Sequence, residues 1–308
     1  MDLSAINPVL LIASLMVAST PILLAAIGEL VVEKAGVLNL GVEGMMITGA
    51  ICGFIAAHHS QSVTLGYIGA AAGGAALALV FALLTQFLLS NQVATGLALT
   101  LFGLGFASLA GQGYNGIKAP TSYRLDIPVI SDLPVIGPIL FSHDIMVYVS
   151  LLLCLGVWIF LNRTRAGLIL RAVGENHDAA HALGYKVVLV RCLAILFGGA
   201  CAGLGGAYLS LVRVPQWTDG LTAGAGWIAL AIVVFASWRP DRLLIGAYLF
   251  GGITVLQINL QLARVPVPVS LLAMAPYIVT ILALVLISRG RRSSASPAMI
   301  GRPFHATQ

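Results

Sequence analysis

The chain has 308 residues, 59% of them hydrophobic and 9% charged, with a mean hydropathy of +1.00 and a formal net charge of +5. Because about a quarter of the residues in a soluble domain are charged, this composition excludes a soluble globule and predicts an all-α polytopic membrane protein. The basic residues lie in short loops beside apolar segments, which is typical of membrane orientation and argues against nucleic-acid binding.

A template of about 20 apolar residues finds nine candidate membrane spans, and the weaker candidates leave a range of eight to ten. The first lacks the basic flank of a cleavable signal peptide, so we expect it to be retained. Together the spans define a transmembrane domain over residues 1–288. The spans lie near residues 8–27, 37–57, 65–89, 93–111, 145–161, 188–212, 226–238, 243–262 and 269–287.

Polar side chains stand where the first span ends and the second begins, in the segment GELVVEKAGVLNLGVEGMM. Such groups are costly at membrane depth unless they face protein or a wet cavity. For Glu29, Glu33 and Lys34 we expect a solvated cluster at the interface. For Asn39 and Glu43, lining of a translocation pathway and bonding between helices both stay open. The glycines of this segment favour a broken or re-entrant second span.

The loops predict the orientation of the chain. Four prolines in the loop 112–144 make a regular helix improbable there and predict a structured cap on the outer face. If the loop 163–191 is cytoplasmic, alternation over nine spans places twelve of the sixteen basic residues inside. The N-terminus is then outside and the C-terminus cytoplasmic. We expect the tail, residues 289–308, to be basic and disordered.

The loop 163–191 is a charged island, because it holds seven of the 27 charged residues between two apolar stretches. In it Asp178, Ala179 and Ala180, with Gly184 four residues later, predict a short helix of small residues that a glycine ends. Small side chains would let this helix sit deep in a groove of a partner, and a solvated connector is the alternative. His177 and an i+4 histidine share a helix face without a third ligand, so no metal site is predicted. Four cysteines in apolar runs, without a CxxC spacing, imply neither a metal nor a disulfide.

The segment GLTAGAGWIALAIVVFASWRP places glycines before a short apolar span and predicts a discontinuous, tightly packed helix. Membrane tryptophans usually anchor interfaces, but Trp217, beside polar residues, could equally meet a solute or a delivery protein. In the eighth span, Gln257 and Asn259 are polar within an apolar run. Bonding between helices and pathway lining are both open for them.

Three motifs, GELVVEKAGVLNLGVEGMM, LRAVGENHDAAHALG and TAGAGWIALAIVVF, together resemble the permease subunits of ABC importers of the nucleoside and simple-sugar group. The ribose and branched-chain amino-acid permeases are more distant relatives of that group. The resemblance runs from the first span through the ninth and excludes the tail. It implies that the island is a cytoplasmic coupling helix that docks on an ATPase. The Glu-Ala-Ala plus Gly signature is matched with Asp in place of Glu, and an Ile-x-Leu-Pro portion of other importer classes is absent. The residues so assigned are Glu175, Asn176, Asp178, Ala179, Ala180 and Gly184.

What the resemblance implies is a transport subunit, not an enzyme, without a cofactor, in the cell (inner) membrane of a bacterium or archaeon. No GxxxxGK[ST] occurs in the sequence, so ATP hydrolysis is expected in a separate ATP-binding cassette subunit. An extracytoplasmic substrate-binding protein and a second, often non-identical permease are the other expected partners. The expected solute is a nucleoside, moved by alternating access, while simple sugars and riboflavin-like compounds stay open.

Two other classes compete with this interpretation. A secondary transporter or channel would more often carry a charged relay inside its spans, where Glu43 is the lone acidic candidate. An intramembrane enzyme would need paired aspartates or a nucleophile and base within the spans.

Overall fold

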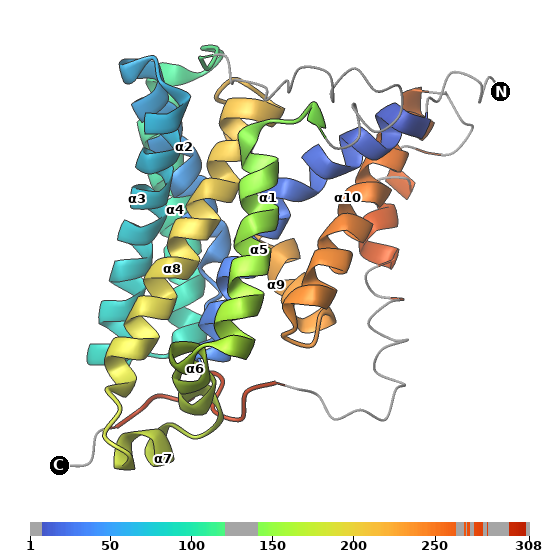
Figure 1. Cartoon of the computed structure of the whole chain (residues 1–308). Helices are drawn as coiled ribbons and strands as arrows, with labels where there is room; N and C mark the ends of the chain where they lie inside the picture. The colour runs from blue at the N-terminus through green and yellow to red at the C-terminus, as the bar shows by residue number, and fades with distance from the viewer. Residues whose placement is uncertain are drawn as a thin grey trace.

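The computed structural model describes residues 8–120, 141–262, 268, 270–271, 274–279, 282 and 296–305, which form helices and no named strand. Figure 1 shows most of these helices running between two ends of a bundle, with α6 and α7 at the lower end and the start of α1 at the upper end. The helices are α1 (Pro8–Lys34), α2 (Val42–Ser60), α3 (Val63–Ala82), α4 (Gln92–Gly111), α5 (Ile145–Arg163), α6 (Arg165–Glu175), α7 (His177–Ala182), α8 (Val187–Tyr208), α9 (Ala225–Phe235) and α10 (Pro240–Leu262).

The prediction of a polytopic helical membrane protein is confirmed. Within the described residues, six helical segments are long and apolar enough to cross a membrane. The buried α2 and the shorter apolar α9 lie between them in the chain, and most of the predicted span 269–287 lies outside the described residues. The six are 9–34, 63–87, 92–114, 145–163, 187–213 and 240–262.

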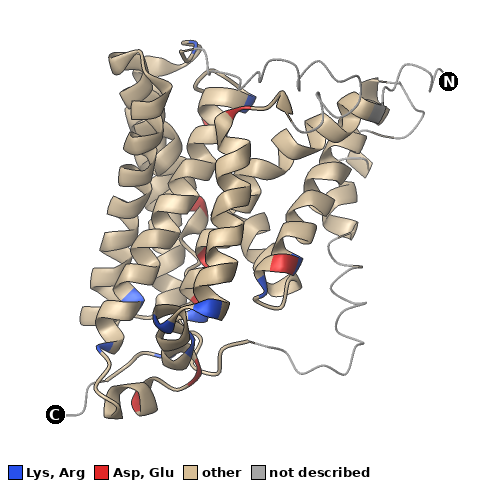
Figure 2. Cartoon of the chain, viewed as in Figure 1, with Lys and Arg blue, Asp and Glu red and all other residues tan. Residues whose placement is uncertain are grey.

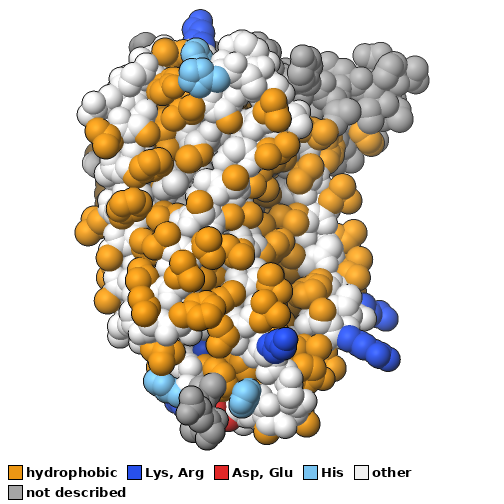
Figure 3. All heavy atoms as spheres, turned by 90° about the vertical axis from the view of Figure 1, so that its left-hand side faces the viewer, with side chains coloured by type: hydrophobic (Ala, Val, Ile, Leu, Met, Phe, Trp, Pro, Cys, Tyr) orange, Lys and Arg blue, Asp and Glu red, His pale blue; other side chains and the backbone are white. Residues whose placement is uncertain are grey.

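The outer surface of the bundle is apolar, as a lipid-facing surface must be. Figure 3 shows hydrophobic side chains covering the face on the side of α3 and α4. On α4, Leu101 and Leu109 are 71% and 70% exposed. Lys and Arg instead gather toward the lower end of the bundle, around α6 and α7 (Figure 2). Water therefore meets the chain at that end, and hydrocarbon meets its sides.

Helix α8 holds the bundle together because its glycines let α1, α2 and α3 approach its backbone. A Cβ atom at Gly203 would lie 2.2 Å from the Ala70 carbonyl oxygen of α3, and one at Gly206 would lie 1.9 Å from the Met46 carbonyl oxygen of α2. At these positions the backbones are too close for a side chain to fit between them. The hydrophobic core consequently lies where α1, α2, α3 and α8 meet.

Helix α1 is longer than predicted, and the cluster of acidic residues at its end is not solvated. It continues to Lys34, past the predicted end at residue 27, and carries Glu29 and Glu33 inside the bundle at 1% exposure each. Both carboxylates accept hydrogen bonds from protein groups, so the helix does not have to end at the interface. Helix α2 is continuous and begins at Val42, so the break favoured by the glycines precedes the helix.

Residues 296–305 differ from the expected disordered tail, since they lie against the ends of α1, α6 and α8 (Figure 1). Backbone hydrogen bonds join Met299 N to the Gly174 carbonyl and Gly301 N to the Gly36 carbonyl. At the opposite end of the bundle, residues 121–140 of the predicted cap lie outside the described residues, and residues 115–118 pair with residues 216–217 through isolated bridges.

The close approach at α8 yields a stability prediction. Gly203→Ala should destabilise the chain by about 1–3 kcal/mol, because the added methyl must displace the α3 backbone. Thermal unfolding of the purified chain in detergent measures this. The control is Gly105→Ala in α4, where a Cβ would meet nothing within 4 Å. A Gly203→Ala chain as stable as this control would refute the packing role of α8.

Candidate functional site

The predicted coupling helix is a separate helix, α7, at the lower end of the bundle (Figure 1). Asn176 is its N-cap, and its side-chain oxygen accepts a hydrogen bond from Ala179 N at 2.9 Å. Gly184, with a φ of +87°, follows the helix in the left-handed region, as the sequence indicated. Glu175 ends the preceding helix α6, so a single extended residue separates the two.

The two alanines of α7 face in opposite directions. Ala179 is exposed, next to Asp178, whose side chain is 75% exposed. Ala180 is 2% exposed and packs with Val173, Val187 and Phe304. The two are therefore not one docking surface: Ala179 is available to a partner, while Ala180 seats the helix on its own chain.

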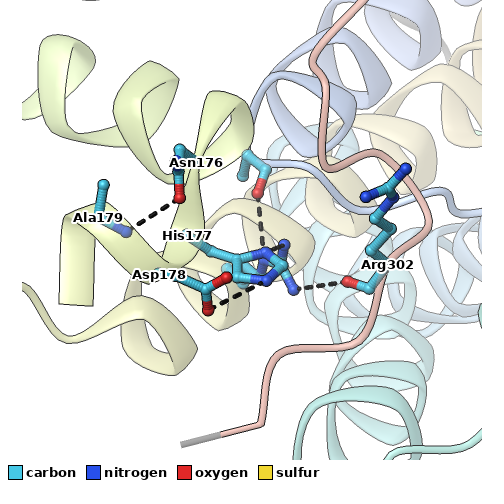
Figure 4. A network of polar contacts seen from close by, with 7 residues as sticks. Asn176, His177, Asp178, Ala179 and Arg302 are labelled. Carbon is cyan, nitrogen blue, oxygen red and sulfur yellow. Dashed lines mark hydrogen bonds and ion pairs between the residues drawn. The ribbon is translucent and has the colours of Figure 1, made fainter. Parts of the chain in front are cut away.

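Arg191 of α8 is fully buried and joins three segments at this end. Figure 4 shows two of its neighbours, His177 of α7 and Arg302 of the tail, facing the same network. Its Nε donates to the Ala35 carbonyl at 3.2 Å, its Nη1 donates to the Arg302 carbonyl at 3.1 Å, and its Nη2 meets His177 Nδ1 at 3.1 Å. A buried guanidinium needs such acceptors, because an unpaired charge in the interior is strongly destabilising. Arg191 thus hydrogen-bonds to the end of α1, to the tail and to α7.

His177 is the acceptor in this network. Because a guanidinium only donates, Nδ1 must carry the lone pair and the proton must lie on Nε2, which points to Asp178 Oδ1 at 3.6 Å. Burial, followed by the positive charge of Arg191, lowers the pKa of His177. The neutral imidazole is therefore the form that fits this site.

Glu43 bonds α2 to the start of α9. Its Oε1 accepts from the Thr222 hydroxyl at 2.5 Å and from Gly224 N at 3.0 Å, and its Oε2 accepts from Gly226 N at 2.6 Å. Gly224 is the N-cap residue of α9 and has a φ of +85°. Because glycine has no side chain, it cannot cap the helix itself. The Glu43 carboxylate caps α9 from another helix and satisfies the first amides, where a negative charge is favoured.

A second set of polar contacts involves Glu29 and Glu33 of α1. Asn39 donates from its Nδ2 to Glu29 Oε2 at 3.3 Å, and its Oδ1 accepts from Gly41 N at 2.9 Å. Trp238 donates its indole N–H to Glu33 Oε2. These bonds hold the connection between α1 and α2, and the turn after α9, against α1.

A cavity of about 900 Å³ opens at the end of the bundle opposite α7. Its wall includes the polar side chains of Ser14, Lys118, Asp144, Arg213 and Asn259 among apolar residues of α1 and α10. It is wide enough for a small polar solute.

The predicted pathway residues do not come together at this cavity. Asn259 lines it, whereas Gln257, two residues away on α10, does not. Trp217 is 1% exposed and packs on Phe54 and Gly111. Asn39 and Glu43 lie in the interhelix networks. Glu43 thus bonds one helix to another and Asn39 bonds the α1–α2 connection to α1, while a pathway role of either residue stays a prediction.

Arg191 and the residues of the tail were not selected from the sequence as site residues. A signal for Arg191 existed, because a charge at the start of an apolar run usually has a functional or structural partner. None existed for Phe304, which lies in a segment of low hydrophobicity.

Residues 11–287 match the family described as "Branched-chain amino acid transport system / permease component". The chain is 44% identical over 248 residues to the "Putative glucose ABC transporter permease protein TsgC13" of Haloferax volcanii, covering 79% of this chain and 75% of that protein.

Two further relatives are matched over most of their length. The "Guanosine ABC transporter permease protein NupQ" of Bacillus subtilis is 33% identical, covering 92% of this chain and 93% of that protein. The "Nucleoside ABC transporter permease protein NupC" of Lactococcus lactis is 31% identical, covering 90% and 92%. No solved structure matches the chain significantly.

The Glu43 cap yields a prediction. Glu43→Gln should destabilise the chain by about 1–3 kcal/mol, because an amide nitrogen would face the amides of Gly224 or Gly226. Thermal unfolding measures the loss, and Asp219→Asn, at an exposed carboxylate bonded to Ser108, is the control. Equal effects of the two substitutions would contradict the cap.

His177 predicts a pH dependence of the tail contact. Its pKa is lower in the folded chain than the unfolded value of about 6.5, so its stabilisation is complete above that value and is lost as the pH falls below it. The charged groups that affect it are Arg191, Asp178, Arg302 and His305. The protection factors of the Met299 and Gly301 amides, which are corrected for the intrinsic exchange rate, should fall between pH 7.5 and pH 5.5. His177→Gln, which keeps an acceptor, should remove this fall, and an unchanged fall would assign it to another group.

Proposed function

Because this chain belongs to the branched-chain amino acid transport system / permease component family and is the membrane permease subunit of an ABC importer for a nucleoside or a sugar, we propose that it carries a nucleoside. The resemblance to permeases found in the sequence is thereby confirmed. The chain is a transport subunit and not an enzyme, and its partners include an ATPase and a substrate-binding protein.

Coupling to the ATPase runs through α7. The observation that carries this proposal is a capped six-residue helix outside the spans, with Ala179 exposed and Ala180 seated on the bundle. Closure of the ATPase would push α7, and the push would bias the spans between outward-facing and inward-facing states. Glu175, Asn176, Asp178 and Gly184 shape and flank this helix.

The topology that supports this coupling has nine spans, with the N-terminus outside and α7 and the C-terminus in the cytoplasm. The concentration of Lys and Arg around α6 and α7 supports it (Figure 2). In this topology residues 163–191 are the coupling loop within a transmembrane domain of residues 1–288, and residues 112–144 are the external loop. A second permease, often non-identical in the resembling group, completes the complex.

The cavity opposite α7 is the outward entrance in this proposal, and Asn259 is the pathway residue at its wall. Hydroxyls and ring nitrogens of a nucleoside would find donors and acceptors there in Arg213, Lys118 and Ser14. The pathway roles of Asn39, Glu43, Trp217 and Gln257 stay predictions, because alternating access changes which side chains line the path.

A sugar is the second candidate solute. The 44% identity to a putative glucose permease favours it, whereas the nucleoside permeases match more of the chain. Mass spectrometry of the small molecule retained by the co-purified substrate-binding protein separates the two. A retained hexose would overturn the nucleoside proposal.

The coupling proposal predicts the behaviour of a pair of variants at one exposed position. Ala179→Arg should abolish ATP-dependent nucleoside uptake at a normal membrane level, because the long cation cannot enter a groove shaped for a small side chain. Ala179→Ser, which keeps the size small, should retain uptake. Uptake that survives in Ala179→Arg, or that survives ATP depletion in the unaltered chain, would refute coupling through α7.

A further inference from the structure

The segment Pro297–His305, which we name the C-terminal strap, lies at the lower end of the bundle and contacts α6, α7, α8 and the turn after α1 (Figure 1). Met299 N donates to Gly174 of α6 at 3.0 Å and Gly301 N donates to Gly36, after α1, at 3.2 Å. The Arg302 carbonyl accepts from Arg191 of α8 at 3.1 Å. Three backbone groups of the strap are thus satisfied by three different elements.

The strap also forms the seat of α7. The Phe304 ring lies edge-on to His177 and His181, with centroids 5.3 and 5.2 Å apart. It is 6% exposed and completes a small hydrophobic cluster with Ala180 and its neighbours. A helix of six residues has little stability of its own, so its position depends on what packs beneath it. Phe304 is the part of that surface that the strap supplies, beside Val173 of α6 and Val187 of α8.

Two glycines make room for this arrangement. Gly36 has a φ of +83°, and a Cβ there would lie 3.1 Å from Arg191 Nη2. A Cβ at Gly174 would lie 2.2 Å from the Lys34 carbonyl oxygen. The ends of α1 and α6 therefore touch backbone to backbone, with the strap bonded to both. A displacement of α7 would therefore act on closely packed backbone at the ends of α1 and α6.

We infer that the C-terminal strap and Arg191 hold α7 in the position in which it engages the ATPase and transmit its displacement to α1 and α8. The inference rests on the proposed function. Arg191 is the positioning residue, because its three donors tie α7, the strap and the end of α1 to α8. A single ammonium could not reproduce this planar set of donors.

The exposed side of the strap belongs to the same surface as α7. Arg302, Pro303 and His305 are exposed beside the exposed face of α7, while Phe304 between them points inward. The partner that docks on α7 therefore also meets the strap. The ATPase is the occupant of this surface, because α7 and the strap lie together at the end where coupling is proposed (Figure 1).

The experiment compares two shortened chains in the complete complex. One ends after Ala295 and lacks the strap, and the matched control ends after His305 and keeps it. Loss of the strap should lower ATP-dependent uptake by about tenfold at an equal membrane level, and the control should transport like the full chain. Equal uptake and equal ATP hydrolysed per solute in both shortened chains would overturn the inference.

Point variants distinguish a role of the strap in positioning α7 from a contribution only to the stability of the fold. Phe304→Ala should raise the ATP hydrolysed per solute and accelerate hydrogen exchange at Met299 and Gly301, and Phe304→Leu should restore both. Arg191→Lys should behave as Phe304→Ala does. If Phe304→Ala lowers only the unfolding temperature and leaves the ATP per solute unchanged, the strap is merely structural and the inference fails. A full-length complex without ATP-dependent uptake would refute the proposed function instead.

Discussion

Every charged group inside this bundle needs a protein partner, because lipid offers none. Four of these groups, Glu29, Glu33, Glu43 and Arg191, bond to groups of another segment. The Glu43 carboxylate caps α9 from α2, Glu29 and Glu33 hold the turn before α2 and the turn after α9, and Arg191 ties α8 to α7 and the tail. These few groups therefore fix the relative positions of segments that are far apart in the sequence.

The close contacts of α8 hold the helices in the relative positions that these hydrogen bonds require. Since α1, α2 and α3 touch the α8 backbone at glycines, the helices cannot slide without breaking contacts along their length. Arg191 stands on the same helix, one turn from its start. Through Arg191, α7 is thus bonded to the helix on which the packing of the bundle depends, and the proposed coupling would act on that helix.

The location of the polar side chains also separates two kinds of role. Those of the α1–α2 region hold α9 and the α1–α2 connection in place, whereas Asn259 and Arg213 line the cavity at the opposite end from α7. In the proposed mechanism, coupling and solute entry lie at the two ends of the bundle, as alternating access requires of an importer subunit. The spans between the two ends would have to transmit a movement at α7 to the cavity.

The sequence by itself determined the apolar spans, the class of membrane protein and the short helix between Asn176 and Gly184, because runs of hydrophobic residues, caps and turn glycines are local signals. It did not determine that Glu29 and Glu33 are buried or that residues 296–305 are ordered. Those outcomes depend on partners far away in the chain: Glu43 and Gly226 are 183 residues apart, and Arg191 and Arg302 are 111 apart. A local pattern shows that a polar group needs a partner, but only the packed tertiary structure decides which partner it finds.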